Sequence, residues 1–295
     1  MTWLCILLAI VGLLVLVALT YWQLIIAEGA YLGPHVVAWT YDWFASRYDD
    51  VKQFNPRDES WFIAGPLLSA LQGVSCPLVL DVATGTGRLP LALFRQHFGG
   101  QIIGLDLSRR MLRQARSKLR LYGGQMCLIR LDASRPRGRS TPSAPTPLPF
   151  EDGTFDAVTC LEALEFLPRP LEALAEMVRV LAPGGVLFIT NRVGSEARLL
   201  PGRAIPRPLF EQALASQPLR DVHVRRWQAD YDLAMARKDG HGDSEGRGGV
   251  DLSSVLRCAG CGGQLQRGVA RLSCPVCERT YPIREGIYEC RPGGR

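Results

Sequence analysis

Four cysteines near the carboxyl end of the chain have the spacing of metal ligands. Cys258 and Cys261 form one Cys-x-x-Cys pair, Cys274 and Cys277 form a second, and 12 residues separate the pairs. Four thiolates satisfy the tetrahedral preference of Zn²⁺, and this spacing favours one metal ion over two disulfides. Because protein would fill all four positions, no place remains for a catalytic water. The pattern therefore predicts a structural zinc.

A glycine-rich turn in the first half of the chain could hold a nucleotide-like ligand. The run 78–82 is almost entirely apolar and leads into Ala83-Thr84-Gly85-Thr86-Gly87, after which a helical pattern begins. Such a run is typical of a buried parallel strand. Glycines there allow a tight turn that a ligand can approach closely. The third glycine of a dinucleotide fingerprint would fall at Pro90, which argues against NAD.

An acidic residue follows at the distance expected for a nucleoside ligand. A second apolar run, 101–105, ends at Asp106, about 20 residues beyond the glycine turn, where a carboxylate can accept hydrogen bonds from ribose hydroxyls. A glycine turn alone is a weak signal. The ordered series of strand, turn, helix, strand and acid is a much stronger one.

Composition limits the possible classes of protein. The chain has 295 residues, enough for one large domain and a small module beside it. Its 47% hydrophobic content is ordinary for a globular protein and excludes disordered and fibrous classes. The net charge of +6 is mild and its basic residues are scattered, which favours a solvated surface over a nucleic-acid-binding one.

The amino-terminal segment is apolar enough to cross a membrane. Residues 3–26 contain no charged residue in 24 positions, and a bilayer-spanning helix needs about 20. Tyr21 and Trp22 lie where an interfacial aromatic belt is expected. No Lys or Arg precedes the run, which disfavours a signal peptide, and no face is polar, which disfavours a core helix. We expect a single membrane anchor over residues 1–28.

Hydrophobic periodicity predicts the remaining elements. The spacing of seven places Tyr41 and Tyr48 on one face of a helix. The proline-rich stretch 134–147 predicts a surface loop, and the glycine-rich stretch 239–251 a flexible linker. Further helices are expected at 108–120, 171–181 and 207–215, a turn at 182–185, and strands at 126–131, 155–160, 186–191, 222–227 and 230–236.

This order of elements resembles the class I S-adenosylmethionine-dependent methyltransferases. The stretch from Asp81 to Gly87 is close to the form found in quinone-biosynthesis and related small-molecule methyltransferases, and the resemblance covers roughly 41–238. It implies an α/β fold, a Rossmann-like doubly wound sheet of seven strands at 78–238, with a helical cap at 29–77 over the donor site.

The resemblance also implies a cofactor, S-adenosyl-L-methionine, and the residues that hold it. It places Asp106 on the ribose, Asp132 near the adenine amino group and Leu161 at the methionine end. The family pattern departs at 134–147, because the expected Leu-Pro-Phe turn comes late, at 148–150. The full set of expected cofactor-binding residues is Tyr48, Asp81, Ala83, Gly85, Gly87, Asp106, Leu107, Asp132, Ala133 and Leu161.

The carboxyl-terminal module has a resemblance of its own. Residues 281–287, which follow the cysteines, resemble the zinc ribbon of methyltransferase-activating subunits, with the module spanning 252–290. The resemblance implies a possible protein partner for this module.

Methyl transfer requires alignment of donor and acceptor more than a catalytic side chain, so no catalytic residue is assigned. Glu162 or Glu165 could remove a proton from the acceptor, or either could be structural. We expect a lipid-soluble small molecule as acceptor, and a catalytic domain facing the cytoplasm, where the donor is found. The alternatives are a soluble or protein substrate, an RNA methyltransferase, or a non-catalytic donor-binding scaffold. Nucleic acid is the least favoured partner, since no basic patch interleaved with aromatics is present.

Overall fold

The computed structural model describes residues 2–132, 148–242, 244–251 and 254–290. Within these ranges the strands form one continuous mixed sheet, in the order β6-β7-β5-β4-β1-β2-β3-β11-β10-β9-β8. The strands are β1 (Leu78–Val82), β2 (Gln101–Asp106), β3 (Met126–Arg130), β4 (Phe155–Cys160), β5 (Leu181–Arg192), β6 (Leu219–Trp227), β7 (Tyr231–Lys238), β8 (Gln266–Arg267), β9 (Arg271–Ser273), β10 (Thr280–Arg284) and β11 (Ile287–Glu289).

Helices cover both faces of this sheet, as a parallel core requires. The α-helices are α1 (Thr2–Tyr21), α2 (Pro34–Phe44), α3 (Tyr48–Lys52), α4 (Pro56–Glu59), α5 (Gly65–Ala70), α6 (Arg88–Arg95), α7 (Arg109–Lys118), α8 (Pro170–Val180), α9 (Gly194–Ala197) and α10 (Arg207–Ala215). Single π-helical turns lie at Trp22–Ile26 and Ser60–Ala64, and short 3₁₀ turns at Ala30–Leu32, Arg120–Tyr122 and Leu164–Phe166.

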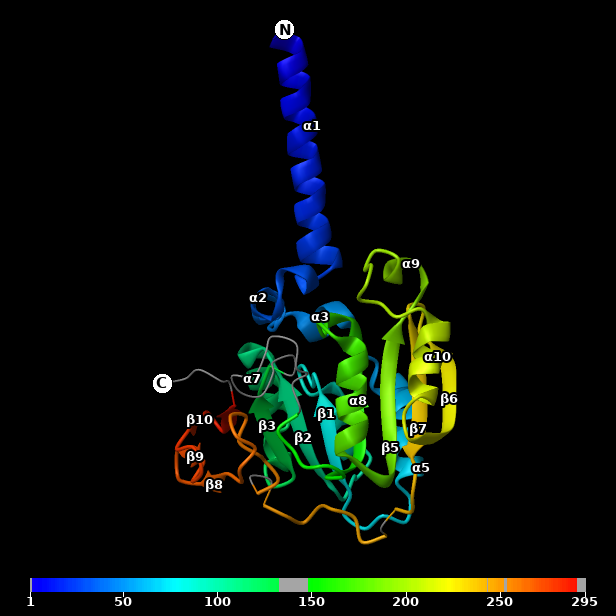
Figure 1. Ribbon diagram of the computed structural model, residues 1–295, viewed down its shortest axis with the longest axis vertical. Helices are drawn as coiled ribbons and strands as arrows, with labels where there is room; N and C mark the ends of the chain where they lie inside the picture. The colour runs from blue at the N-terminus through cyan, green and yellow to red at the C-terminus, as the bar shows by residue number, and fades with distance from the viewer. Residues whose placement is uncertain (1, 133–147, 243, 252–253, 291–295) are drawn as a thin grey trace.

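The central strand β1 organises the parallel core. All five of its residues are buried, and it pairs in parallel with β2 on one side and β4 on the other. The chain therefore moves outward in one direction through β3 and in the other through β5. Ligands of such sheets bind at the carboxyl ends of the strands where the order reverses. In this protein that end of the sheet lies nearest to α1 (Figure 1).

The carboxyl-terminal module that carries the four cysteines, called the ribbon below, is joined to the sheet through its last strand. Strand β11 pairs in parallel with β3, with Ile287 opposite Leu128, so the described sheet extends beyond the seven predicted strands. Ion pairs reinforce this junction, including Arg113 with Glu285 at 2.6 Å. An edge strand exposes unpaired backbone groups, and β11 covers that edge. Strand patterning could not predict the pairing, because it gives no partner for an edge strand.

The region expected to turn after α8 is part of a strand. Strand β5 begins at Leu181, five residues before the predicted start at 186. Gly184 has a φ of +73°, and the pairing of β5 with β4 shifts register between Phe155 and Ala157. The irregular Pro-Gly-Gly stretch is thus absorbed as a bulge within the sheet.

The cap helix expected over Tyr41 and Tyr48 is divided in two. Helix α2 ends at Phe44 and α3 begins at Tyr48, with a turn between them. The two tyrosine rings still pack together, with centroids 6.1 Å apart. The predicted neighbourhood is present, although the helix that was expected to create it is broken.

Residues 239–251, predicted to be a flexible linker, connect the two edges of the sheet. The described part of the segment passes along the end of the sheet opposite α1 (Figure 1). Arg247 forms an ion pair with Asp156 at 2.8 Å, and Gly248 N–H donates to the carbonyl of Cys76 at 2.8 Å. These contacts hold the connection against the body of the protein.

Helix α1 projects from the body as a single rod (Figure 1). With the π-helical turn that follows, it forms an apolar segment of 25 residues, long and apolar enough by length and composition to cross a membrane. None of the residues of α1 is buried, so it is not a core helix. The chain enters the body of the protein at Ala27 and Ala30, both buried.

Because β11 of the ribbon pairs with β3, we expect the ribbon to stabilise the whole molecule. Ile287 is fully buried among residues of the methyltransferase-like core, including Leu128 and Ile102. Replacing Ile287 by Ala should lower the free energy of unfolding of the entire chain by about 2–5 kcal/mol, because it leaves a cavity in that shared core. Chemical denaturation followed by far-ultraviolet circular dichroism measures the change.

A matched control comes from the same module. Val269 is fully exposed, so Val269→Ala should leave the unfolding curve unchanged. If Ile287→Ala melts only the ribbon, and hydrogen exchange in β1 and β4 stays at the wild-type rate, the shared core is not a cooperative unit.

Candidate functional site

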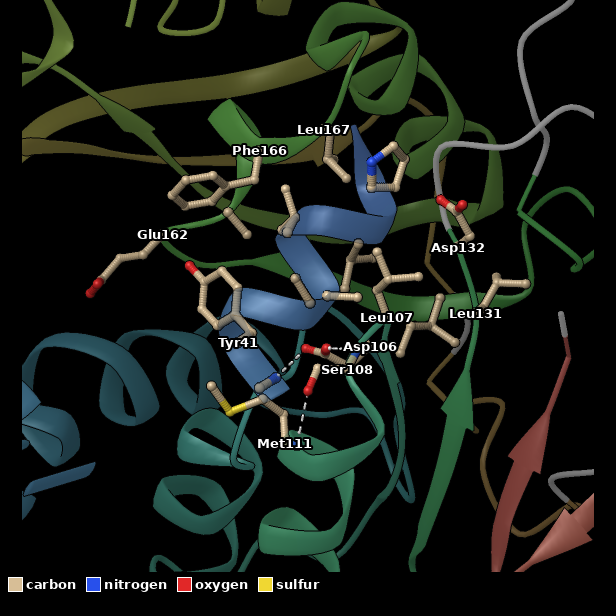
Figure 2. A pocket seen from close by; sticks show the side chains of 18 of the residues that line it. Tyr41, Asp106, Leu107, Ser108, Met111, Leu131, Asp132, Glu162, Phe166 and Leu167 are labelled. Atoms are coloured by element: carbon tan, nitrogen blue, oxygen red, sulfur yellow. Dashed lines mark hydrogen bonds between the residues drawn. The ribbon is translucent and has the colours of Figure 1, made fainter. Parts of the chain in front are cut away.

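A cavity opens at the carboxyl ends of the central parallel strands. It holds about 850 Å³ of empty space, including its open mouth. Its floor is formed by the glycine turn and the ends of β2 and β3, and α2 lies across it as a roof (Figure 2). The segment after β4, including Phe166 and Leu167, forms one wall. This size and position are typical of a small-molecule site.

The two glycines of the turn have different roles. Gly85 has a φ of +55°, and a Cβ added there would meet nothing closer than the carbonyl oxygen of Ala83 at 4.0 Å. Its backbone therefore faces the open cavity. Gly87 has a φ of +79°, and a Cβ there would lie 2.9 Å from Leu119 Cδ1. Gly85 leaves room for a ligand, whereas Gly87 permits close packing of helix against helix.

Asp106 lies at the end of β2 beside the turn. Its Oδ2 accepts the N–H of Gly85 and its Oδ1 accepts the N–H of Ser108, both at 2.8 Å (Figure 2). Burial raises the pKa of Asp106 to about 6, although these backbone donors lower it. A backbone hydrogen bond from Leu107 also lowers this pKa. A carboxylate has about four lone-pair sites, so Asp106 can still accept from ligand hydroxyl groups. The arrangement suits a ribose.

Asp81 supports the turn from below. Its carboxylate accepts the hydroxyl of Thr84 at 2.6 Å and that of Thr159 at 2.7 Å, which ties the turn to β4. Burial raises the pKa of Asp81 to about 6, and the two hydroxyl donors oppose that rise. Asp81 borders only a smaller cavity that adjoins the first.

A cationic centre in this smaller cavity was not foreseen from the sequence. Arg88 donates to both carboxylate oxygens of Glu59, at 2.6 and 2.7 Å, and to Glu162 at 2.5 Å. Lys52 lies 3.2 Å from Glu162. An arginine in the first turn of a helix opposes the helix dipole, and that unfavourable placement directly after the glycines is the signal that could have revealed it.

The two candidate bases occupy different environments. Burial alone would raise the pKa of Glu162, but Arg88 and Lys52 lower it below its ordinary value, which makes this carboxylate a weak base. Glu165 is buried outside the cavity lining, where it accepts the hydroxyl of Tyr231 at 2.8 Å. Burial raises the pKa of Glu165.

A third carboxylate, Glu28, was also missed. It follows the apolar amino-terminal segment and accepts the hydroxyl of Tyr41 at 2.5 Å, and Tyr41 lines the cavity. Burial raises the pKa of Glu28, although the hydrogen bond from Tyr41 lowers it. Its only signal in the sequence is that it is the first charged residue after the apolar run.

The structure brings most of the predicted cofactor-binding residues to one place. Asp81 borders the adjoining cavity, Gly87 borders neither, and Ala133 lies outside the described residues, as does the 134–147 stretch. Those that line the larger cavity are Tyr48, Ala83, Gly85, Asp106, Leu107, Asp132 and Leu161.

The four predicted metal-binding cysteines converge at the tip of the ribbon. Their Sγ atoms all lie within 4.8 Å of one another, and the Sγ atoms of Cys258 and Cys277 are 3.5 Å apart. Tetrahedral zinc with Zn–S bonds of about 2.3 Å requires a spread of this order. All four are free thiols, so the group fits one metal ion.

Comparison with known proteins agrees with this geometry. Residues 80–189 match the family model described as "Methyltransferase domain", and residues 250–286 match that described as "Trm112p-like protein". The chain is 31% identical over 188 residues to a ubiquinone biosynthesis O-methyltransferase of Methylococcus capsulatus, covering 60% of this chain and 71% of that protein. It is 38% identical over 111 residues to a demethylmenaquinone methyltransferase of Thermus thermophilus, covering 38% of this chain but only 45% of that protein.

Solved structures share the fold at low sequence identity. The [4+2]-cyclase SpnF superposes with a TM-score of 0.52 at 20% identity, covering 70% of this chain and 97% of that one. An O-methyltransferase family protein of Burkholderia thailandensis gives 0.50 at 15% identity, covering 73% and 63%. A parallel sheet with a glycine turn after its central strand and an acid at the end of the next strand is typical of nucleoside-binding α/β proteins. Within that class, the chain belongs to the class I S-adenosylmethionine-dependent methyltransferase family.

The site predicts a specific loss of donor affinity on removal of one carboxylate. Asp106→Ala should weaken binding of S-adenosyl-L-methionine by ~10²–10⁴-fold, because two hydrogen bonds to a charged acceptor, each worth about 1.5–3 kcal/mol, are lost. Isothermal titration calorimetry measures the affinity. Asp152→Ala is the control, since that carboxylate is exposed on the surface and should leave affinity unchanged. Equal affinities for wild type and Asp106→Ala would remove Asp106 from the donor site.

Proposed function

We propose that this protein transfers the methyl group of S-adenosyl-L-methionine to a lipid-soluble small molecule at a membrane surface. One observation carries the proposal: the cavity that holds the donor-binding residues is roofed by α2, which begins only 13 residues after α1 ends. Helix α2, which lines the cavity, lies near the base of α1 (Figure 1).

The donor supplies a sulfonium methyl group that is already activated for displacement. In this proposal Asp106 binds the ribose hydroxyls and Asp132 the adenine amino group. Tyr48 and Arg88 line the adjoining cavity and would hold the methionine end, where the guanidinium would supply a positive charge for its carboxylate. What the chain contributes to the reaction is alignment and exclusion of water, which account for most of the rate enhancement in such transfers.

The acceptor is proposed to lie under the apolar roof. Val37 and Ala38 of α2 line the cavity together with Phe166 and Leu167, and none of these four side chains carries a charge. The two curated relatives described above are named for ubiquinone and demethylmenaquinone, which are lipid-soluble. SpnF is named as a cyclase, so the shared fold does not fix the reaction, and turnover must be measured.

The amino-terminal helix is proposed to be a single-pass anchor that leaves the catalytic domain in the cytoplasm. Its length, apolar composition and exposure support the anchor. The orientation follows from the donor, which is a cytosolic metabolite.

The ribbon is proposed to hold one structural zinc and to act on its own methyltransferase domain. Four protein thiolates would complete the coordination shell, so the metal would organise the fold around Cys258 and Cys274 and supply no reactive water. The partner is proposed to be internal, because β11 already occupies the free edge of β3.

Zinc removal is therefore expected to affect the whole chain. Native mass spectrometry should find one zinc per protein, absent from Cys258→Ser, and that variant should melt at a lower temperature because its ribbon no longer supports β3. Cys5→Ser is the control, since Cys5 is an exposed thiol in α1. A metal-free wild type, or a Cys258→Ser variant that retains its zinc, contradicts the assignment.

Truncation separates a lipid-soluble acceptor from a soluble one. A chain beginning at Trp22 keeps the contacts of Trp22 and Glu28 with the body but lacks α1. Donor affinity should be unchanged, whereas transfer of labelled methyl groups to membrane-extracted lipid in vesicles should fall sharply, because enzyme and acceptor no longer share a surface.

Asp106→Ala in the full-length chain is the control for that experiment, because it should lose transfer to every acceptor. Full activity of the truncated chain on a water-soluble extract, with none on lipid, would overturn the lipid acceptor. Binding of the donor with no turnover on any fraction would favour the scaffold alternative.

A further inference from the structure

One face of helix α2 lines the cavity, and the opposite face is exposed on the surface of the protein. Pro34, Val37, Ala38 and Tyr41 line the cavity, and their spacing of three and four residues places them on one side of the helix. The opposite side carries Trp39 and Trp43, four residues apart, which are 60% and 65% exposed. The roof of the site therefore presents two large aromatic side chains outward.

The base of α1 is fixed to the body by specific contacts. Trp22 stacks on Tyr31 with ring centroids 5.1 Å apart, and its indole N–H donates to the carbonyl of Leu199 at 2.9 Å. The Tyr31 hydroxyl donates to the carbonyl of Pro201 at 2.8 Å, and Arg203 donates to that of Ala30 at 2.7 Å. These contacts join α1 directly to the body, with no free linker between them. They therefore fix the orientation of the helix relative to the surface of the body around its base.

That surface includes exposed large apolar side chains. Leu199, whose carbonyl accepts the indole N–H of Trp22, is 44% exposed, and Leu32 is 56% exposed. Helix α2, which carries the two tryptophans, lies near the base of α1 (Figure 1). An exposed group of large apolar side chains on a soluble surface marks a site of interaction. Tryptophan in particular is enriched at the level of lipid headgroups, where its ring is half in hydrocarbon and its N–H is hydrated.

We propose that the outer face of α2, carried by Trp39 and Trp43, lies in the headgroup region of the same bilayer that α1 crosses. The inference rests on the membrane anchorage proposed above and does not depend on the identity of the methyl acceptor. It assigns a second membrane contact, made by the roof of the active site.

The length of the anchor supports a bilayer as the occupant of this face. The helical segment Thr2–Ile26 has 25 residues and is therefore about 37 Å long, whereas the hydrocarbon core is about 30 Å thick. The last turn lies at headgroup level, and α2 begins eight residues after it. A rigid joint then holds α2 beside the bilayer, which is continuous with the surface that already surrounds α1.

The inner side of α2 is held by polar contacts, so the helix is clamped between protein and lipid. Asp42 accepts the hydroxyl of Ser108 at 2.6 Å and the N–H of Arg110 at 2.9 Å, which fixes the end of α2 to the start of α7. Tyr41 is bonded to Glu28. A membrane contact on the outer face of α2 would place the mouth of the cavity at the surface of the bilayer, where a lipid-soluble acceptor can reach it.

Quenching of tryptophan fluorescence by lipid tests this placement in the full-length protein. The chain is reconstituted in nanodiscs of phosphatidylcholine, with and without phosphatidylcholine brominated on its acyl chains. Lipid contact predicts that the combined substitution Trp39→Phe and Trp43→Phe lowers the quenched fraction of the emission, since two quenchable rings are removed. Phenylalanine keeps the face apolar, and circular dichroism melts check that the variant is folded.

Trp61 provides the matched control. It is 78% exposed but lies in the Ser60–Ala64 turn, outside α2. Trp61→Phe should raise the quenched fraction, because it removes an emitter that lipid does not reach. An equal quenched fraction in the wild type and the double variant would overturn the proposal. A second result would also overturn the proposal: weak quenching of the wild type in discs that light scattering shows to hold two copies of the protein. That result would assign the outer face of α2 to a contact with the second copy.

Neither donor nor acceptor is present in this measurement. Its failure would leave the methyl-transfer proposal standing. Conversely, absence of turnover would not alter the quenching result.

Discussion

The candidate site depends on one buried carboxylate, Asp81, at the centre of the sheet. Its native pKa of about 6 lies above that of an unfolded aspartate, so the native state binds a proton more readily. The ionised form present at neutral pH therefore weakens the fold, and this contribution grows as pH rises from about 4 through 6. The hydroxyls of Thr84 and Thr159 donate hydrogen bonds to the carboxylate and so reduce the free-energy cost of its ionised form. Through these hydrogen bonds, Asp81 fixes the turn that carries Gly85 against both β1 and β4.

The same turn also contains a residue with an unfavourable backbone conformation. Ala83 has a φ of +57°, in a region where a side chain costs about 1–2 kcal/mol relative to the right-handed form. Glu162 across the site has a φ of +51° and donates its N–H to Thr190 at 2.6 Å. Strained backbone of this kind persists where the surrounding contacts over-determine it, and it is concentrated at functional sites. Here both strained residues face the cavity proposed to hold the donor.

Local patterning was enough to predict the parallel core. The apolar runs that became β1 to β4 and the acids at the ends of β2 and β3 follow from periodicity within about ten residues. The contacts that complete the site do not. Arg88 meets Glu59 and Glu162 from three separate segments, and β11 finds β3 from the far end of the chain. The position of Arg88 in the first turn of a helix can mark that residue, but no local signal shows which carboxylates meet it, because that depends on how the helices and strands pack. The break between α2 and α3 was missed for the same reason, since helical spacing alone does not show where a helix stops.

The pairing of β3 with β11 has a consequence for biosynthesis. Leu128 and Ile287 are partners, yet about 160 residues of chain separate them. During translation α1 and the parallel strands emerge first, and the edge of β3 that β11 later covers has no partner strand at that stage. Such an edge can recruit other extended chains. The nascent protein is therefore exposed to mispairing until β11 leaves the ribosome, and a ribosome that stops before β11 would release a domain with an uncovered edge at β3.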